Sequence, residues 1–197
     1  MSTETSDGRD AEDMERLAAG HDAALNDLMG RHGEPVFHFL IRVLQNETDA
    51  ADLAQEAFVR VYQNRLKFDR ARKFSTWLYA IAANLARDRV RWRLRHPQVS
   101  LDAENEETGG TLADAVAGQS PSPSQLMEAK EKAAAVRRAI AELAEDLRLP
   151  LVLAEYEGRA QGEIASILDC SVKAVEMRLY RARRQLRKRL ERLFHQA

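Results

Sequence analysis

Two sets of arginine and lysine side chains recur at helical spacing, and these residue types bind anions. Arg87, Arg91 and Arg95 are four residues apart, so they fall on one side of a helix. Arg89 and Arg93 form the neighbouring row. The second set comprises Lys173, Arg178, Arg181, Arg184 and Lys188. Because rows of like charge repel each other unless an anion lies against them, the spacing favours two surfaces that bind a polyanion. Helices that are merely arginine-rich are the alternative.

The distribution of charge along the chain supports the same interpretation. The 197 residues carry a net charge of only −1. Residues 67–96 contain 9 Lys and Arg against 2 Asp and Glu, and residues 171–197 contain the same numbers. Residues 1–66, in contrast, contain 6 basic and 13 acidic residues. A merely solvated surface interleaves its charges, so this segregation indicates two separate polyanion-binding surfaces.

Other kinds of chemistry lack the residues they need. Cys170 is the single cysteine, which excludes an internal disulfide, a thiolate zinc site and a CxxC redox pair. The histidines lack metal-ligand spacing, and no nucleophile, base and orienting group or phosphate-binding loop is evident. We therefore expect no metal, no cofactor and no enzymatic activity. No apolar run approaches the roughly 18 residues that span a bilayer, and the acidic N-terminus lacks a secretory signal, so a cytoplasmic location without membrane insertion is expected.

The elements that carry these residues are predicted to be helices throughout. Prolines are few, long stretches are rich in Ala, Leu, Glu and Arg, and no alternating run is typical of a strand. Phe74, Leu78, Ile81 and Leu85 fall on one stripe that is expected to be buried. The predicted helices span residues 10–19, 21–32, 35–45, 49–66, 74–95, 126–143, 147–157, 161–168 and 172–193.

A change in composition divides the chain into two helical domains. Residues 97–125 contain a Gly pair, an SPSPS segment and no basic residue, which is typical of a flexible acidic linker. The predicted fold class is therefore all-α with two small helical domains. The expected divisions are an acidic, partly helical segment at 1–20, a first domain at 21–96, the linker at 97–125 and a second domain at 126–197.

The second domain contains a helix-turn-helix pattern. A short helix is followed by Asp169, Cys170 and Ser171, and then by a long basic helix that Ser171 can cap. Gly158 is well placed to end the helix before this motif in a left-handed conformation. In DNA-binding proteins the second helix of such a motif enters the major groove, but any three-helix bundle also contains a tight turn.

Three segments in this order resemble the signatures of sigma factors of the sigma-70 family, specifically the short, two-domain, extracytoplasmic-function (ECF) group. The resemblance covers about residues 21–193 outside the linker. The segments are DAADLAQEAFVRVYQ (49–63), KFSTWLYAIAANLARDRVRWRLR (73–95) and YEGRAQGEIASILDCSVKAVEMRLYRARRQLRKRL (156–190). The resemblance implies a sigma-2-like helical bundle followed by a sigma-4-like helix-turn-helix domain. It also implies a function in promoter-specific transcription initiation by RNA polymerase.

Site residues follow from the resemblance, segment by segment. The first segment resembles the part that binds the beta-prime clamp helices of core polymerase, which also includes the beta subunit. The implied core-binding residues are Asp52, Gln55, Glu56 and Arg60, whereas Leu53, Ala57 and Val61 are expected in the core. The loop at 64–73 and the helix after it resemble the part that melts and binds the −10 element. The implied −10 residues are Lys67, Arg70, Arg72, Lys73, Trp77, Asn84, Arg87, Asp88 and Arg91. The available aromatic residues are Phe68, Trp77, Tyr79 and Trp92, with Phe74 and Trp77 favoured as core.

The helix-turn-helix segment resembles the domain that binds the −35 element as duplex DNA. The implied −35 residues are Ser171, Lys173, Ala174, Met177, Arg178, Arg181 and Arg184. The resemblance also implies a dedicated anti-sigma protein, which could hold the chain at the membrane. Two alternatives stay open at this point. One is a free-standing helix-turn-helix regulator, and the other is an interaction module without direct DNA contact.

Overall fold

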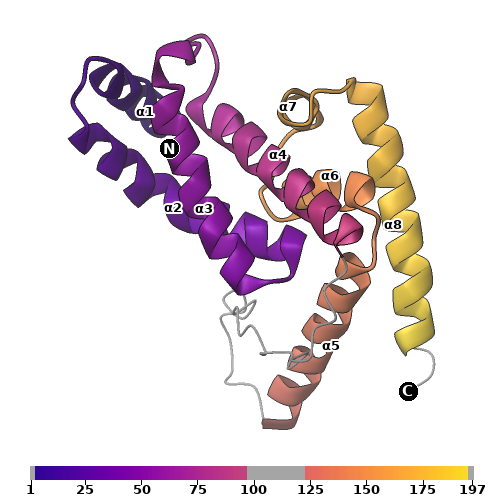
Figure 1. Cartoon of the computed structure of the whole chain (residues 1–197). Helices are drawn as coiled ribbons and strands as arrows, with labels where there is room; N and C mark the ends of the chain where they lie inside the picture. Colours follow the sequence, from indigo (N-terminus) through magenta and orange to yellow (C-terminus); the bar gives the residue numbers. More distant parts are fainter. Residues whose placement is uncertain (1–2, 97–122, 195–197) are drawn as a thin grey trace.

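A computed structural model describes residues 3–96 and 123–194 of the chain, and these residues are predominantly helical (Figure 1). The first range forms α1 (Thr3–Ala18), α2 (Ala23–Leu44), α3 (Glu47–Gln63), the 3-10 helix η1 (Arg65–Lys67) and α4 (Phe74–Arg95). The second forms α5 (Pro123–Ala141), α6 (Glu145–Glu155), α7 (Gln161–Ile167) and α8 (Val172–Phe194). Neither range contains a strand, and the all-α prediction is confirmed. The predicted linker falls outside the described residues as far as residue 122, and α5 begins earlier than expected.

Helix α2 continues through Pro35, so the predicted division into helices at 21–32 and 35–45 is wrong. A proline inside a helix removes one backbone hydrogen bond and costs about 3 kcal/mol. Leu28, Val36, Phe39 and Val43 lie on both sides of Pro35 and are fully buried. Since each such side chain contributes roughly 1.5–3 kcal/mol when buried, their packing outweighs the loss.

The helix ends are fixed by local side-chain and backbone chemistry. Asn46 caps α3, and its side chain accepts a 2.8 Å hydrogen bond from the Asp49 amide. Ser171 caps α8 as predicted, accepting from the Ala174 amide at 3.2 Å. Gly158 follows α6 with φ of 60°, which confirms its predicted left-handed conformation. Asp169 adopts φ of 50° in the turn between α7 and α8, a left-handed conformation that Asp and Asn tolerate better than most other non-glycine residues do.

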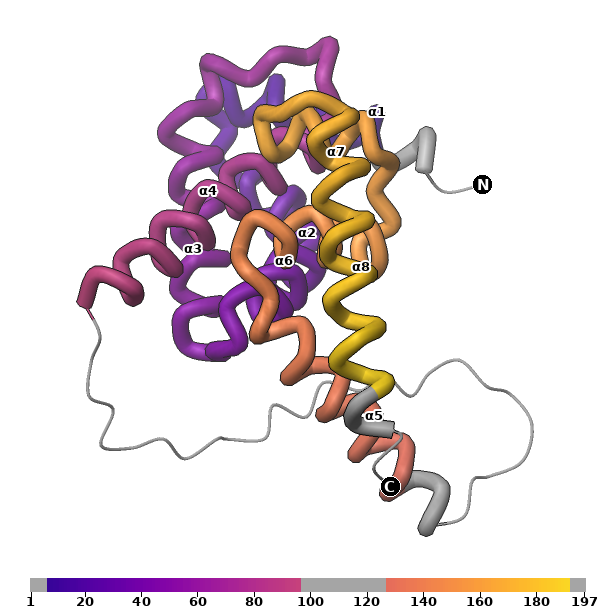
Figure 2. Tube along the Cα trace, turned by 90° about the vertical axis from the view of Figure 1, so that its right-hand side faces the viewer, coloured from indigo at the N-terminus to yellow at the C-terminus, as the bar shows by residue number. Residues whose placement is uncertain are grey.

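The first four α-helices form a bundle, and the last four pack on one another beside it (Figure 1). Leu53, Ala57 and Val61 of α3 are buried, as predicted. In the second group, α8 packs along α5, α6 and α7, as a view turned by 90° also shows (Figure 2). Its apolar residues Val175, Leu179 and Ala182 are buried on the side that faces these helices.

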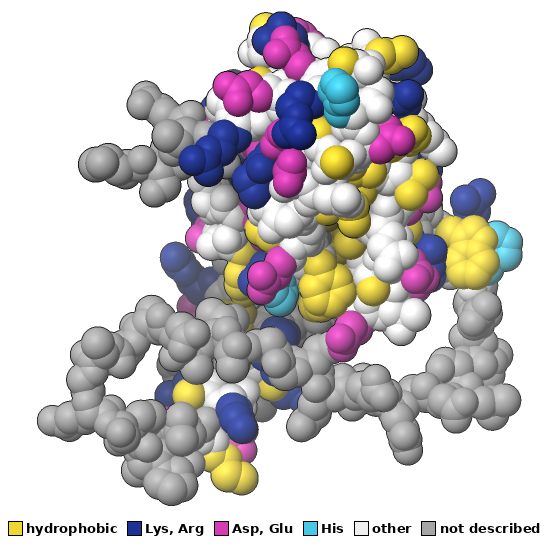
Figure 3. Space-filling view, turned by 90° about the vertical axis from the view of Figure 1, so that its left-hand side faces the viewer, with side chains coloured by type: hydrophobic (Ala, Val, Ile, Leu, Met, Phe, Trp, Pro, Cys, Tyr) yellow, Lys and Arg dark blue, Asp and Glu magenta, His cyan; other side chains and the backbone are white. Residues whose placement is uncertain are grey.

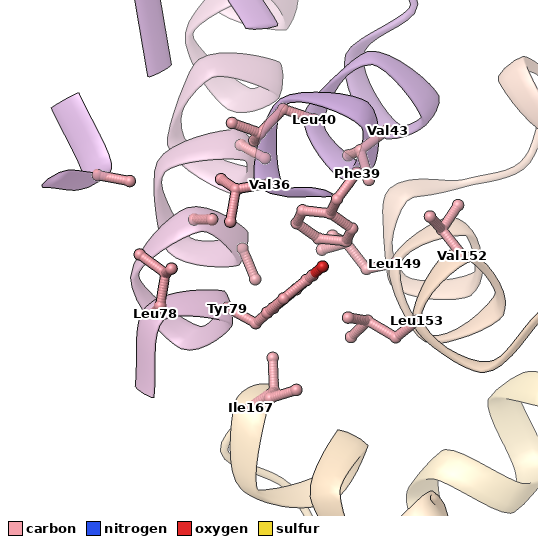
Figure 4. Close-up of a cluster of buried hydrophobic side chains, with 14 of the residues drawn as sticks. Val36, Phe39, Leu40, Val43, Leu78, Tyr79, Leu149, Val152, Leu153 and Ile167 are labelled. Carbon is pink, nitrogen blue, oxygen red and sulfur yellow. The ribbon is translucent and has the colours of Figure 1, made fainter. Parts of the chain in front are cut away.

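One apolar cluster connects the two groups of helices (Figure 4). Phe39 of α2 and Tyr79 of α4 are in edge contact, with ring centroids 5.2 Å apart. From the other group, α6 contributes Leu149 and Leu153, and α7 contributes Ile167. All five side chains are at most 2% exposed. The two helical groups therefore share a continuous core in this conformation.

No helix within the described ranges has both the length and the apolar composition to cross a lipid bilayer.

Candidate nucleic-acid interfaces

Helix α8 presents most of the implied −35 residues on the side that faces away from its core contacts. The exposed members are Ser171, Lys173, Met177, Arg181 and Arg184, and the half-buried members are Ala174 and Arg178. Within the described part of the chain, Lys173, Arg181 and Arg184 form no ion pair. The surface is therefore cationic and free to contact solvent.

Other cations of the same helix contact neighbouring parts of the second group. Arg178 donates a hydrogen bond to the Cys170 thiol at 3.4 Å, which links the helix to the turn before it. Arg183 pairs with Glu155 of α6 at 2.7 Å. Arg189 donates to the Ala139 carbonyl of α5 at 3.2 Å and lies 3.4 Å from Glu142 in the turn after α5. The positions that interact with α5 and α6 thus alternate with those that stay free, because a helix presents successive residues on different sides.

Helix α4 differs, because one of its two arginine rows already has an intramolecular anion. Arg89 and Arg93 both pair with Asp49 of α3, at 2.6 and 2.5 Å. The Asp49 side chain is only 13% exposed. This row therefore stabilises the bundle, whereas Arg91 and Arg95 of the other row are exposed.

Arg87, an implied −10 residue, points towards the second group of helices. Its Nε donates to Glu145 of α6 at 3.2 Å, and its Nη1 donates to Asn84 at 2.7 Å. Burial raises the pKa of the Glu145 carboxyl above its usual value, although Arg87 and Arg91 oppose the shift. Asn84 and Asp88 are exposed on the same helix.

The loop before α4 is basic, and helix α1 covers part of it with acidic side chains. Lys67, Arg70, Arg72 and Lys73 are all exposed. Arg70 pairs with Glu15 of α1, and Lys73 pairs with Asp7 of α1 at 3.1 Å. Lys73 also lies 4.0 Å from Glu163 of α7.

The aromatic residues near this loop divide into core and surface. Phe74 is 1% exposed, and half-buried Trp77 packs against Phe68 with centroids 5.2 Å apart, which agrees with the preference for a core role. Tyr79 is 2% exposed and cannot serve as a surface for base stacking in this conformation. Trp92 is 42% exposed, and its ring stacks on His96 at a centroid distance of 4.9 Å. In the stripe predicted to be buried, Ile81 is only half-buried, while Leu78 and Leu85 are buried.

The implied core-binding residues lie together along α3. Asp52 and Gln55 are exposed, while Glu56 and Arg60 are half-buried and pair with each other at 3.0 Å. On the side of the molecule where α1, α2 and α3 lie, acidic and basic side chains are interspersed and apolar side chains appear between them (Figure 3). Such a mixed surface suits contact with a protein better than contact with DNA.

A buried charge network joins α1 to α2 and was not predicted from the sequence. Asp10 is 1% exposed and accepts from Arg31 at 2.9 Å, and its other oxygen lies 2.8 Å from His32. Asp13 pairs with Arg31 at 2.6 Å. Burial raises the pKa of Asp10, but His32 and Arg31 outweigh it, so the pKa lies below its usual value. The three-residue spacing of Asp10 and Asp13 was the available signal. In the described ranges, no group of three His, Cys, Asp or Glu side chains is arranged to hold a metal.

A second unpredicted set of residues, the Glu157 cluster, lies between the two groups of helices. It comprises Arg42, Ser75, Tyr79, Glu157 and Arg159. The Tyr79 hydroxyl donates to Glu157 at 2.6 Å, and Arg42 donates to the other carboxylate oxygen at 3.2 Å. Arg159 lies over the Tyr79 ring at 4.6 Å and donates to the Ser75 hydroxyl at 3.1 Å. Burial, and then the Glu157 carboxylate, raise the pKa of Tyr79 far above its usual value, so its hydroxyl remains a donor.

Comparison with known proteins identifies both helical groups. Residues 28–95 match the family model Sigma-70 region 2, and residues 133–186 match Sigma-70, region 4. The chain is 34% identical to ECF RNA polymerase sigma factor SigW of Bacillus subtilis, over 90% of this chain and 94% of that protein. It is 36% identical to ECF RNA polymerase sigma-E factor of Escherichia coli K12, over 86% and 88%.

A solved structure gives the same result. CnrH, in complex with the cytosolic domain of CnrY, superposes with a TM-score of 0.68 and 28% sequence identity. The match covers 93% of this chain and 97% of CnrH. These relatives do not favour a free-standing helix-turn-helix regulator. The order of the two domains and the similarity over most of the chain show that this protein belongs to the ECF group of sigma-70 family RNA polymerase sigma factors.

Proposed function

We propose that this sigma factor directs core RNA polymerase to its promoters through three surfaces. These are the polar side of α3, the basic loop at 64–73 with the exposed side of α4, and the exposed side of α8. The observation that carries the proposal is the free cationic side of α8 on a helix-turn-helix motif, together with a second basic surface on α4. Neither surface performs covalent chemistry in the proposed function.

The polar side of α3 would bind the clamp helices of the beta-prime subunit through Asp52, Gln55, Glu56 and Arg60. Glu56 and Arg60 already form an ion pair along the helix, so their side chains are held in one arrangement. An acidic helix that docks on protein gains nothing from attracting DNA, which agrees with its charge.

The loop and α4 would bind the opened −10 strand. Extruding a base costs a few kcal/mol, and cations and aromatic surfaces must offset this cost. Lys67, Arg70, Arg72 and Lys73 supply charge at the loop, and Arg91 supplies it on α4. Trp77, Asn84, Arg87 and Asp88 complete the proposed set. We add Trp92 to it, because its ring is exposed beside Arg91.

The N-terminal part of α8 would enter the major groove at the −35 element. Ser171, Lys173, Ala174, Met177 and Arg178 would reach bases, and Arg181 and Arg184 would bind the phosphate backbone. The two promoter elements, about 25 base pairs apart, are separated by about 85 Å. Residues 97–125 would bridge them.

The proposal includes a cytoplasmic location, where polymerase acts, and regulation by an anti-sigma protein. The anti-sigma partner follows from membership of the group, and the similar structure of CnrH was solved with the cytosolic domain of a second protein. A membrane-bound partner would then place the chain at the membrane.

Initiation assays test the proposal directly. Bound promoters are first mapped in cells, and purified protein is then added to core polymerase on those templates. We expect initiation at one defined start site that requires the added chain. Failure to bind core polymerase and to alter the choice of start site would contradict the proposal.

A double variant tests the proposed contact between α3 and core polymerase. Changing Gln55 and Glu56 to alanine removes one exposed and one half-buried polar side chain without touching the core, so we expect weaker binding to core polymerase and unchanged helical content. Glu128→Ala with Glu131→Ala, on exposed positions of α5, is the control. Equal affinity of the two double variants in a pull-down would remove Gln55 and Glu56 from the interface.

A further inference from the structure

The contacts between the two groups of helices cover residues that the proposed function assigns to DNA. Arg87 pairs with Glu145 of α6, and Lys73 approaches Glu163 of α7. The Arg87 side chain is only 23% exposed. In this conformation carboxylates of the second domain therefore contact two cations that the proposed function assigns to the −10 strand.

The interface between the domains combines apolar packing with hydrogen bonds between polar side chains and backbone groups. Phe39, Tyr79, Leu149 and Leu153 are buried there (Figure 4). In addition, Arg148 of α6 donates to the carbonyl oxygen of Val43 at 2.6 Å. That oxygen belongs to the last turn of α2, where carbonyl groups lack partners within the helix. Such packing and pairing indicate a specific contact rather than a loose collision of domains.

The Glu157 cluster is the part of the interface most sensitive to a single change. Glu157 is the shared acceptor for Tyr79 and Arg42, and its side chain is 9% exposed. Removing one partner of a buried charged hydrogen bond leaves the other groups unsatisfied, which costs more than the bond contributes. Separation of the domains instead returns these groups to water.

We propose that the free protein adopts this closed state as an autoinhibited form, held by the Glu157 cluster, and that binding of the −10 strand requires the domains to separate. The proposal rests on the proposed function for the identity of the DNA contacts. In this closed state, α6 and α7 of the chain's own second domain cover part of the surface of α2 and α4. The apparent affinity for the −10 strand is then the intrinsic affinity multiplied by the fraction of molecules that are open.

Charge reversal at Glu157 tests the closed state. Glu157→Arg places a cation beside Arg42 and Arg159, so we expect the domains to separate and the radius of gyration in small-angle X-ray scattering to increase. For an open fraction of about one tenth in the wild type, the variant should bind a single-stranded −10 oligonucleotide of a mapped promoter about tenfold more tightly. The double variant Arg42→Glu with Glu157→Arg restores opposite charges and should recover most of the closed state.

The controls separate opening from unfolding. Glu155→Arg makes the same charge change two residues away, at an exposed position outside the cluster, and should leave the radius of gyration unchanged. Circular dichroism should show wild-type helical content for every variant. Tyr79→Phe serves as a second variant in case Glu157→Arg does not fold. It removes only the hydroxyl and should also increase the affinity for the oligonucleotide.

The outcomes distinguish this proposal from the proposed function. An extended wild-type protein, or equal radii and affinities for wild type and the folded cluster variants, would overturn the closed state even if the chain initiates transcription normally. Loss of core binding and initiation in both wild type and variants would instead overturn the proposed function. A larger radius and tighter oligonucleotide binding in the cluster variants, with rescue by the double variant, would support the closed state.

Discussion

The two basic helices have similar charge but different surroundings. In α4, Arg87 pairs with α6 and Arg89 and Arg93 pair with α3. In α8, Arg181 and Arg184 are exposed and form no ion pair within the described residues. The two candidate DNA surfaces therefore differ in whether their cations already pair with carboxylates of the same chain.

A row of arginines can therefore either bind a ligand or stabilise the fold. On α8 the cations are available for phosphate, whereas on α4 several stabilise the fold and the closed arrangement. Duplex binding by α8 is thus expected to precede strand binding by α4, because only the latter needs the domains to separate. The predictions that follow test this comparison.

The largest expected effect is the loss of duplex binding when α8 loses its cations. Arg178→Ala with Arg181→Ala removes one proposed base contact and one proposed phosphate contact, each worth about 1–3 kcal/mol. We expect about 100-fold weaker binding of −35 duplex DNA and a shallower dependence of log affinity on log salt. Fluorescence anisotropy at several salt concentrations measures both.

A matched control shows whether charge alone is responsible. Lys130→Ala with Lys132→Ala removes the same charge from exposed positions of α5 in the same domain. We expect less than a threefold change for this variant. Equal losses for the two double variants would mean that α8 has no special role and would favour an interaction module without direct DNA contact.

A smaller effect is expected at the exposed end of α4. Trp92→Ala should weaken binding of the single-stranded −10 oligonucleotide about tenfold, because stacking on an aromatic ring contributes about 1–3 kcal/mol per base. Trp92→Phe keeps an aromatic face and should retain most of the affinity. Leu94→Ala changes a residue that is 77% exposed near Trp92 and serves as the control. An unchanged affinity for Trp92→Ala would exclude stacking there.

The sequence predicted local features well, because they depend on neighbouring residues. The pattern of α7, turn and α8 could be predicted, since Ser171 caps the next helix and Asp169 tolerates a left-handed conformation. The apolar residues of α3 were also identified from their spacing. In contrast, the predicted division between residues 32 and 35 is wrong, because tertiary burial along α2 outweighs the local cost of Pro35.

Long-range pairing could not be predicted, because periodicity identifies a polar face but not the group that meets it. Glu157 and Tyr79 are 78 residues apart, and Arg87 and Glu145 are 58 apart. The same limit applies to Arg89 and Arg93, which the sequence presented as ligand-binding cations and the fold pairs with Asp49.

A stability difference of about 1–2 kcal/mol is expected from the paired row of α4. Asp49→Asn keeps the shape of the side chain but removes the charge that Arg89 and Arg93 share, and also a favourable charge near the N-terminus of α3. We expect a lower urea midpoint with an unchanged slope. A midpoint equal to that of the wild type would show that the Asp49 pairs do not stabilise the bundle.

The smallest effect is expected from the corresponding pair on α8. Arg183 and Glu155 are 2.7 Å apart, but their side chains are 58% and 47% exposed, so water screens the pair. Glu155→Gln should lower the free energy of unfolding by less than about 0.5 kcal/mol, although it releases a cation beside the proposed DNA surface. Duplex affinity should then stay equal or increase slightly at low salt, since a repelling carboxylate is lost and Arg183 is freed. If Glu155→Gln destabilised the protein as much as Asp49→Asn, α8 would depend on its ion pairs as α4 does, and the contrast between an occupied and a free basic helix would not hold.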